Sequence, residues 1–218
     1  MNTQTMTVEL TFIDDILGTA PANQELHAEY IASRAPDAPS REEEIAAIGV
    51  DAEIEKGMTV FPRDEEGYPI FWAYQIKGFF KSACAACQKM DGSISSKITA
   101  YKKYVDTQIF VYPSADDPAG RAIRIYTDDE IGGIQRPLRA MTAQGERVAL
   151  ANSERIAKGA KCHFDIVMIS GGDKAKVKGE KQKDLIREWL DFGRFNGLGQ
   201  WRNSGKGAFV WSEAEEQL

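Results

Sequence analysis

The most specific chemical pattern in this 218-residue chain is a glycine-rich segment at residues 195–209, which reads FNGLGQWRNSGKGAF. Two Gly-x-Gly pairs surround its polar, basic centre. Glycine exposes backbone N–H groups without a Cβ in the way, so a phosphate chain can approach closely while Arg202 and Lys206 supply positive charge. The pattern therefore predicts a phosphate-binding loop. The alternative is a glycine-rich connection that only turns the chain.

Two common nucleotide-binding loops are excluded for this segment. Five residues separate Gly199 from Gly205, and Gly207 rather than Ser or Thr follows Lys206, which excludes a Walker loop. The segment follows a predicted helix instead of opening one, which excludes a dinucleotide fingerprint. Trp201 has few apolar neighbours in this polar loop, and we therefore predict that it stacks on a nucleic-acid base.

Candidate catalytic residues are few. The two histidines are His27, in a predicted acidic helix, and His163, on a predicted strand. We expect both to be surface or structural residues, because neither lies in a readable catalytic set. Asp14 and Asp15 follow the first predicted strand, and either could supply a catalytic carboxylate that cleaves a substrate. Adjacent acidic residues at such a position more often form a turn.

The three cysteines do not predict a cofactor. Cys84 and Cys87 share one face of a predicted helix, and with Cys162 and His163 they would complete a four-ligand zinc site. Burial of small thiols against the sheet is the simpler expectation. An odd, small number of cysteines also argues against a disulfide framework. We predict no metal and no cofactor.

Composition predicts a globular cytoplasmic protein with an uneven charge. The hydrophobic fraction is 43%, and no apolar run is long enough to span a membrane or to serve as a signal peptide. The formal net charge is −6, yet residues 1–72 hold 4 Lys and Arg against 15 Asp and Glu, whereas residues 155–206 hold 12 against 6. Such a polarised chain can present a basic surface to a polyanion, although chance clustering of solvated charges is the alternative.

Hydrophobic periodicity predicts the main elements. The predicted strands cover residues 8–12, 107–112, 122–126, 161–169 and 207–211. A basic hairpin is predicted from 133–139 and 146–152. Two helices are predicted, over 75–90 and from about residue 185 to Gly193 or Gly197, after a loop at 171–183. Further helical signals fall at 23–31 and 40–48.

The order of these elements predicts an α+β fold. Without the acidic stretch and the hairpin, it is βαββαβ, the pattern of a ferredoxin-like or RRM-like core. We predict one domain over residues 1–218, with an acidic helical insertion at 14–72 and a basic, thumb-like hairpin insertion at 121–153.

Three segments together resemble the RAMP superfamily, the RRM-like RNA-binding proteins of CRISPR systems. The glycine-rich segment resembles the carboxy-terminal loop of that family. Residues 76–81, IKGFFK, resemble its lysine-glycine signature at the start of the first helix. Residues 135–139, QRPLR, lie in a hairpin where backbone-type members carry a thumb. The resemblance spans residues 6–12 and most of 73–211, and it does not explain 14–72.

The resemblance implies a noncatalytic, oligomerising protein that binds single-stranded RNA, such as a CRISPR-type guide, in antiviral defence. Its partners would be copies of itself or other Cas-like subunits, with no membrane. The implied RNA-binding residues are Lys77 and Lys81 for phosphate, Arg136 and Arg139 in the thumb, and Gly197, Gly199, Trp201, Arg202, Gly205 and Lys206 in the loop. The alternatives are an endoribonuclease of the same family and a mobile-element mimic that interferes with a CRISPR complex.

Overall fold

A computed structural model describes most of the chain. The described residues are 2–22, 58–114, 120–142, 145–170, 177 and 179–214, with the side chains of 138–150 left out. The chain forms two units. Unit 1 contains Met1–Ile16, Arg63–Glu130 and Ile156–Leu218, and unit 2 contains Leu17–Pro62 and Ile131–Arg155. Except for residues 154 and 155, unit 2 thus draws its residues from the two stretches that the sequence predicts as insertions.

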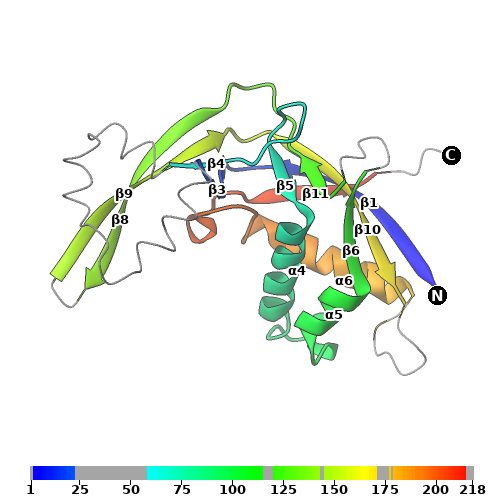
Figure 1. Ribbon diagram of the computed structural model, residues 1–218. Coiled ribbons are helices and arrows are strands. Elements are labelled where there is room, and N and C mark those ends of the chain that lie inside the picture. Colours follow the sequence, from blue (N-terminus) through cyan, green and yellow to red (C-terminus); the bar gives the residue numbers. More distant parts are fainter. Residues whose placement is uncertain are drawn as a thin grey trace, which may run out of the picture. The chain divides into compact units, whose positions relative to one another are not determined.

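A four-stranded antiparallel sheet is the centre of unit 1 (Figure 1). Its strands are β1 (Thr3–Phe12), β6 (Ile109–Pro113), β10 (Lys161–Ile169) and β11 (Phe209–Glu213). Their order across the sheet is β11-β1-β10-β6. The first strand of the chain therefore lies between the last two, with Val8 opposite Phe164 and Phe12 opposite Phe209.

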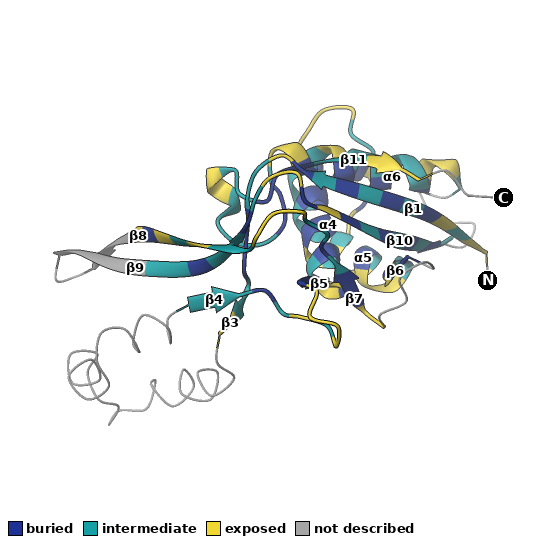
Figure 2. Ribbon diagram, turned by 90° about the horizontal axis from the view of Figure 1, so that it is seen from above, coloured by how far each residue is buried: buried dark blue, intermediate teal, exposed yellow. Residues whose placement is uncertain are grey.

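Helices cover one face of this sheet (Figures 1 and 2). They are α4 (Ala73–Cys87), α5 (Tyr101–Gln108) and α6 (Glu180–Asp191), with short 3₁₀ turns η1 (Ser95–Lys97), η2 (Phe192–Arg194) and η3 (Arg202–Ser204). The apolar residues of α4 and α6 recur at helical spacing and are buried, among them Ile76, Phe80, Leu185 and Trp189. Helices α4 and α6 are therefore amphipathic, and each packs its apolar stripe on the sheet.

The core lies between the helices and the inner face of the sheet. Alternate residues of β1 and β10 are buried, as the period of two requires, and they are Met6, Val8, Leu10 and Phe12 with Cys162, Phe164, Ile166 and Met168. Phe12 contacts the rings of Phe71 and Phe209, and Phe80 contacts Trp189. Full burial of one such aromatic side chain stabilises the fold by roughly 1.5–3 kcal/mol.

A small second sheet of unit 1 precedes α4. It pairs β5 (Ile70–Trp72) with β7 (Ala122–Arg124) in antiparallel fashion. The turn before β5 is held by Asp64, whose Oδ1 accepts hydrogen bonds from the backbone N–H groups of Glu66 and Tyr68 at 3.0 and 2.9 Å. This aspartate turn fixes the position of Tyr68.

Unit 2 contains the long hairpin. Its strands are β2 (Ile16–Leu17), β3 (Ala20–Pro21), β4 (Met58–Val60), β8 (Gly132–Thr142) and β9 (Gly145–Ile156). The hairpin strands β8 and β9 are antiparallel, and β4 joins β9 in parallel with Thr59 opposite Ser153. The hydroxyl groups of these two residues lie 2.7 Å apart. This pairing connects the segment before β5 to the hairpin.

The predicted α+β class is confirmed, and so are the strand at 161–169, the hairpin and the two helices. Several predicted boundaries differ from the observed ones. The strand predicted at 107–112 begins at Ile109, because residues 101–108 form α5, and the loop predicted at 171–183 ends earlier, because α6 begins at Glu180. The helix predicted at 75–90 is Ala73–Cys87, and the strand predicted at 207–211 is Phe209–Glu213. The helical signals at 23–31 and 40–48 fall outside the described residues.

Candidate nucleic-acid interface

Close packing explains two glycines of the glycine-rich segment. The two arms of the segment meet where the N–H of Leu198 donates to the carbonyl of Gly207 at 3.0 Å. A Cβ on Gly197 would overlap the Gly207 carbonyl, and a Cβ on Gly207 would overlap that of Leu198. Gly207 also has a φ of +71°. Both residues must therefore be glycine to close the base of the loop.

The tip of the loop is a tight turn around η3. Gly199 and Gly205 have φ values of +88° and +84°, which favour glycine. Trp201 adopts the same left-handed region, with φ 59° and ψ 33°, and it is the only residue other than glycine with a positive φ in the described part of the chain. A strained tryptophan of this kind points to a functional constraint on the turn.

A lysine of the loop is held by two carboxylates at the end of β1. Lys206 Nζ lies 2.8 Å from Asp14 Oδ1 and 3.3 Å from Asp15 Oδ2. The N–H of Gly207 donates to the Asp15 carbonyl at 2.8 Å, and the N–H of Lys158 donates to Asp15 Oδ1 at 3.2 Å. Asp14 and Asp15 thus connect the loop to the sheet.

The charges of this contact shift the pKa values of both partners. The hydrogen bond from Lys206 lowers the pKa of the Asp14 carboxyl, and the hydrogen bond to Asp14 raises the pKa of Lys206. Each shift favours the charged form. We expected Asp14 and Asp15 to form a turn. In the structure these two carboxylates also neutralise Lys206.

Two arginines of this region have no such partner. Among the described residues, the guanidinium groups of Arg194 and Arg202 make no ion pair or hydrogen bond. By contrast, Arg124 pairs with Asp64 at 2.5 Å and Arg187 pairs with Asp184 at 2.8 Å. The positive charge that this region can offer to an anion is therefore concentrated in Arg202 of the loop and Arg194 just before it.

The two lysines predicted on α4 have internal partners. Lys81 Nζ lies 2.6 Å from Asp106 Oδ1 at the end of α5. Lys77 Nζ donates to the Asp106 carbonyl at 3.3 Å and lies 4.9 Å from the centre of the Phe110 ring. Burial lowers the pKa of Lys77. A phosphate at these lysines would have to compete with Asp106.

The predicted thumb arginines lie on β8. Arg136 is only 7% exposed, and burial lowers its pKa. The side chain of Arg139 lies outside the described residues, as does His27. The hairpin therefore buries the one thumb arginine whose surroundings are described.

The open face of the sheet brings together a cluster that sequence reasoning missed. The ring of His163 on β10 stacks on Tyr126 at 4.9 Å, and its Nδ1 lies 3.6 Å from Glu9 Oε2 on β1. Lys161 Nζ shares the same carboxylate at 2.9 Å. Tyr68 lies 6.0 Å from Tyr126. The alternation of residues in β1 and β10 already predicts that Glu9, Lys161 and His163 do not face the core. To predict that they are neighbours, the sequence would also have to reveal that β1 and β10 pair, and in which register.

The cysteines are buried as expected. Cys84 and Cys87 lie on the buried face of α4, and Cys162 lies on the inner face of β10. Burial raises the pKa of all three thiols, that of Cys87 to about 11. Within the described ranges, no three His, Cys, Asp or Glu side chains lie close enough to hold a metal ion, and no helix is long and apolar enough to cross a membrane.

Comparison with known proteins finds similarity among solved structures only. No protein-family model matches the chain, and no curated protein matches it. A chain in a cryo-EM structure of the type III-B Cmr-beta complex bound to cognate target RNA is 12% identical, with a TM-score of 0.48. The match covers 98% of this chain and 59% of that chain. This chain thus spans less than two thirds of the protein it matches.

Proposed function

We propose that this protein binds single-stranded RNA without cleaving it, through the glycine-rich segment 195–209 and the neighbouring surface of α4. The observation that carries the proposal is the pair of arginines, Arg194 and Arg202, whose guanidinium groups meet no carboxylate in the described part of the chain. A guanidinium is well suited to a phosphate because it binds two oxygens at once. Asn196 Nδ2 donates to Ser82 Oγ at 3.1 Å, which places the segment against α4.

The topology supports a RAMP-type assignment. When α5 and the small strands are set aside, unit 1 follows the order β1, α4, β6, β10, α6, β11, which is strand, helix, strand, strand, helix, strand. These four strands lie in the sheet in the order β11-β1-β10-β6. Both agree with a ferredoxin-like core carrying insertions. We propose on this basis that the protein works with a CRISPR-type effector, as a backbone-like subunit or as a mobile-element protein that interferes with one.

The other predicted site residues contribute to RNA binding in different ways in this proposal. Gly199 and Gly205 give the turn its backbone conformation, and Trp201 offers its indole to a base. Lys77, Lys81 and Lys206 add charge near the phosphates, but each is shared with a neighbouring acidic residue. Arg136 and Arg139 belong to the thumb-like hairpin. We expect Arg194 and Arg202 to dominate affinity.

Self-association is the second part of the proposal. The acidic composition of residues 14–72 complements the basic composition of residues 155–206, which suits a head-to-tail contact between copies. Light scattering at rising salt tests it: we expect oligomers at low salt that dissociate as the charges are screened. A monomer at every salt concentration would remove this part of the proposal.

The test of RNA binding is a salt titration with a labelled single-stranded oligonucleotide. Affinity should fall with a log–log slope of about −0.7 for each phosphate neutralised. Arg194→Ala with Arg202→Ala should weaken binding and make the slope shallower by roughly 1.4. Arg187→Ala is the matched control, because its guanidinium is already paired with Asp184 and Glu213. No binding by the parent, or equal binding by the double variant, would overturn the proposal.

A second candidate function, an endoribonuclease, is favoured by the His163 cluster. His163 would accept the proton of an RNA 2′-hydroxyl while its oxygen attacks the adjacent phosphorus. The bond to the 5′-oxygen would break, that oxygen would take up a proton, and a 2′,3′-cyclic phosphate would remain. Lys161, beside Glu9, would stabilise the added negative charge.

End-labelled RNA incubated with the protein in a chelator separates the two functions. Intact RNA supports the noncatalytic proposal. A cleavage product that is lost in His163→Ala and kept in His27→Ala would establish the nuclease instead.

A further inference from the structure

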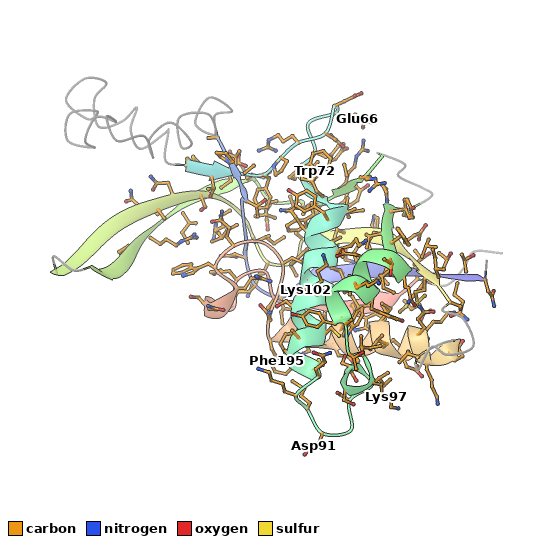
Figure 3. All side chains as sticks on the ribbon, turned by 60° about the horizontal axis from the view of Figure 1, so that its bottom comes forward. Glu66, Trp72, Asp91, Lys97, Lys102 and Phe195 are labelled. Atoms are coloured by element: carbon orange, nitrogen blue, oxygen red, sulfur yellow. The ribbon has the colours of Figure 1, made fainter. Side chains whose placement is uncertain are left out.

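The most exposed large apolar side chain in the described part of the chain is Phe195, at 76%. It lies beside the lower half of α4, at the opposite end of that helix from Trp72 (Figure 3). An isolated exposed apolar residue is common on protein surfaces. Phe195 differs from such residues in the hydrogen bonds that hold its backbone and in the charged residues near it in the chain.

The backbone on both sides of Phe195 is fixed. Its N–H donates to the carbonyl of Phe192 at 3.0 Å, and the N–H of Asn196 donates to the same carbonyl at 3.1 Å. The side chain of Asn196 is bonded to Ser82, as described above, and Leu198 is buried. The fold therefore holds Phe195 outward on a rigid support.

One neighbouring ring borders it. The centre of the Phe192 ring lies 6.4 Å from that of Phe195, and the two planes are tilted by 48°. This ring borders Phe195 on one side and leaves most of its surface accessible. An aromatic side chain has only two rotatable bonds and so loses little entropy when it binds, which suits a recognition role.

The charge around Phe195 selects the class of ligand. Arg194 precedes it in the chain, and Arg202 lies in the loop whose base begins two residues later, at Gly197. Neither guanidinium is neutralised by a described residue. The aromatic cluster around His163 differs, since Glu9 lies within it and Asp165 is the next outward-facing residue of β10. An exposed aromatic ring with one free cation next to it in the chain and another in the loop that follows fits a ligand that is both planar and anionic, and an unpaired nucleotide is both.

We infer that Phe195 is a stacking platform for one unpaired base of a single-stranded RNA whose phosphates contact Arg194 and Arg202. This inference rests on the proposed function and adds to it a requirement for an unstacked base. A duplex, whose bases are already stacked, would not satisfy that requirement. The ligand class is therefore single-stranded nucleic acid.

The test compares two labelled oligonucleotides of equal length, oligo-uridine and the same backbone with abasic sites throughout. Phe195→Ala should weaken binding of oligo-uridine about 5- to 150-fold, the range for loss of one stacked base. Phe195→Trp should restore it, and Phe195→Leu should not. On the abasic backbone, the parent and Phe195→Ala should bind equally.

Tyr74→Ala is the control, because Tyr74 is also strongly exposed, at 68%, but lies in the first turn of α4. It should bind both oligonucleotides like the parent. The melting temperature of Phe195→Ala should stay near that of the parent, since the side chain is mostly in water.

Two results would overturn the inference and leave the proposed function standing. One is unchanged affinity in Phe195→Ala while the double arginine variant still loses binding. The other is an equal loss on both oligonucleotides, which would mean that Phe195 recognises no base. Loss of self-association in Phe195→Ala with unchanged RNA affinity would likewise overturn it and assign the ring to a protein contact. Absence of binding by the parent would overturn both proposals.

Discussion

The ammonium group of Lys206 lies 2.8 Å from Oδ1 of Asp14, a residue 192 positions earlier in the chain. The lysine of the glycine-rich loop is therefore neutralised by the end of the first strand. The sequence of the loop holds two cations, but only Arg202 is available to a ligand, because Lys206 is used to fix the position of the loop.

This contact predicts a local change in dynamics. Asp14→Asn with Asp15→Asn should speed amide hydrogen exchange in the peptide covering residues 196–209, because the ionic attachment of the loop is lost. Mass spectrometry at neutral pH measures the rate. Asp184→Asn, which disturbs an exposed helix pair, should leave the rate in this peptide unchanged. Equal rates in the parent and the double variant would show that backbone contacts alone hold the loop.

The same contact predicts a pH dependence. The pKa of Asp14 is below its usual 3.8 in the folded protein, so its stabilisation is complete above pH 3.8 and is lost as the pH falls through the folded value. The pKa of Lys206 is above its usual 10.5, so its stabilisation is complete below pH 10.5 and is lost as the pH rises further.

Urea denaturation of the parent and of Asp14→Asn measures this dependence. The parent should be the more stable protein between these two limits, and the difference should shrink below pH 3.8. A difference that does not change with pH would contradict an ionic contact.

The strained turn predicts a difference between two replacements of Trp201. Both Trp201→Gly and Trp201→Ala remove the indole, but only glycine adopts a positive φ without cost. The glycine variant should therefore be more stable than the alanine variant by about 1 kcal/mol. Thermal denaturation measures the gap. If alanine proves equally stable, the turn is not held in the left-handed conformation.

The space around Gly197, at the base of the loop, and around Gly78, in α4, predicts that alanine at these positions has opposite effects on stability. Gly197→Ala should lower the free energy of unfolding by about 1–3 kcal/mol, because its Cβ meets the Gly207 carbonyl. Gly78→Ala, in the exposed interior of α4 with open space around it, should raise that free energy by about 0.5–1 kcal/mol. Urea denaturation compares the two variants. A tolerated alanine at position 197 would mean that the two arms of the loop can separate.

Burial predicts unreactive thiols. Since the pKa of Cys87 is raised to about 11 and those of Cys84 and Cys162 are also raised, the native protein should resist alkylation at about pH 8. In denaturant all three cysteines should react. Mass spectrometry counts the added groups, and rapid alkylation of the native protein would show that α4 opens.

Strong periodicity was enough to predict the parts of the fold that pack against one another. β10 alternates buried and open residues along its whole length, and its predicted bounds are its observed bounds. α5 was missed because it is mostly polar and only Val105 on it is buried. Its helical form depends on neighbours, such as the contact between Tyr104 and Trp189, that no local pattern reveals.

The sequence could nominate residues for the candidate site but could not predict their pairings. Arg202 was nominated from charge and glycine spacing alone, and its role stays a prediction. That Lys206 meets Asp14 follows only once β11 is known to lie beside β1, since Phe12 and Phe209 are then opposite one another. A ferredoxin-like strand order, if carried further, predicts that neighbourhood, because it places the first and last strands side by side.

The place of β1 between β10 and β11 has a consequence for synthesis on the ribosome. β1 is made first, but Thr11 pairs with Lys161, and Phe12 pairs with Phe209. At about 5–20 residues per second, β1 waits roughly 8–30 s for its first partner to be translated. During that time the backbone N–H and C=O groups along both edges of β1 lack the strands that will pair with them. The nascent chain should therefore present two unpaired strand edges to other chains until Lys161–Ile169, and then Phe209–Glu213, have been made.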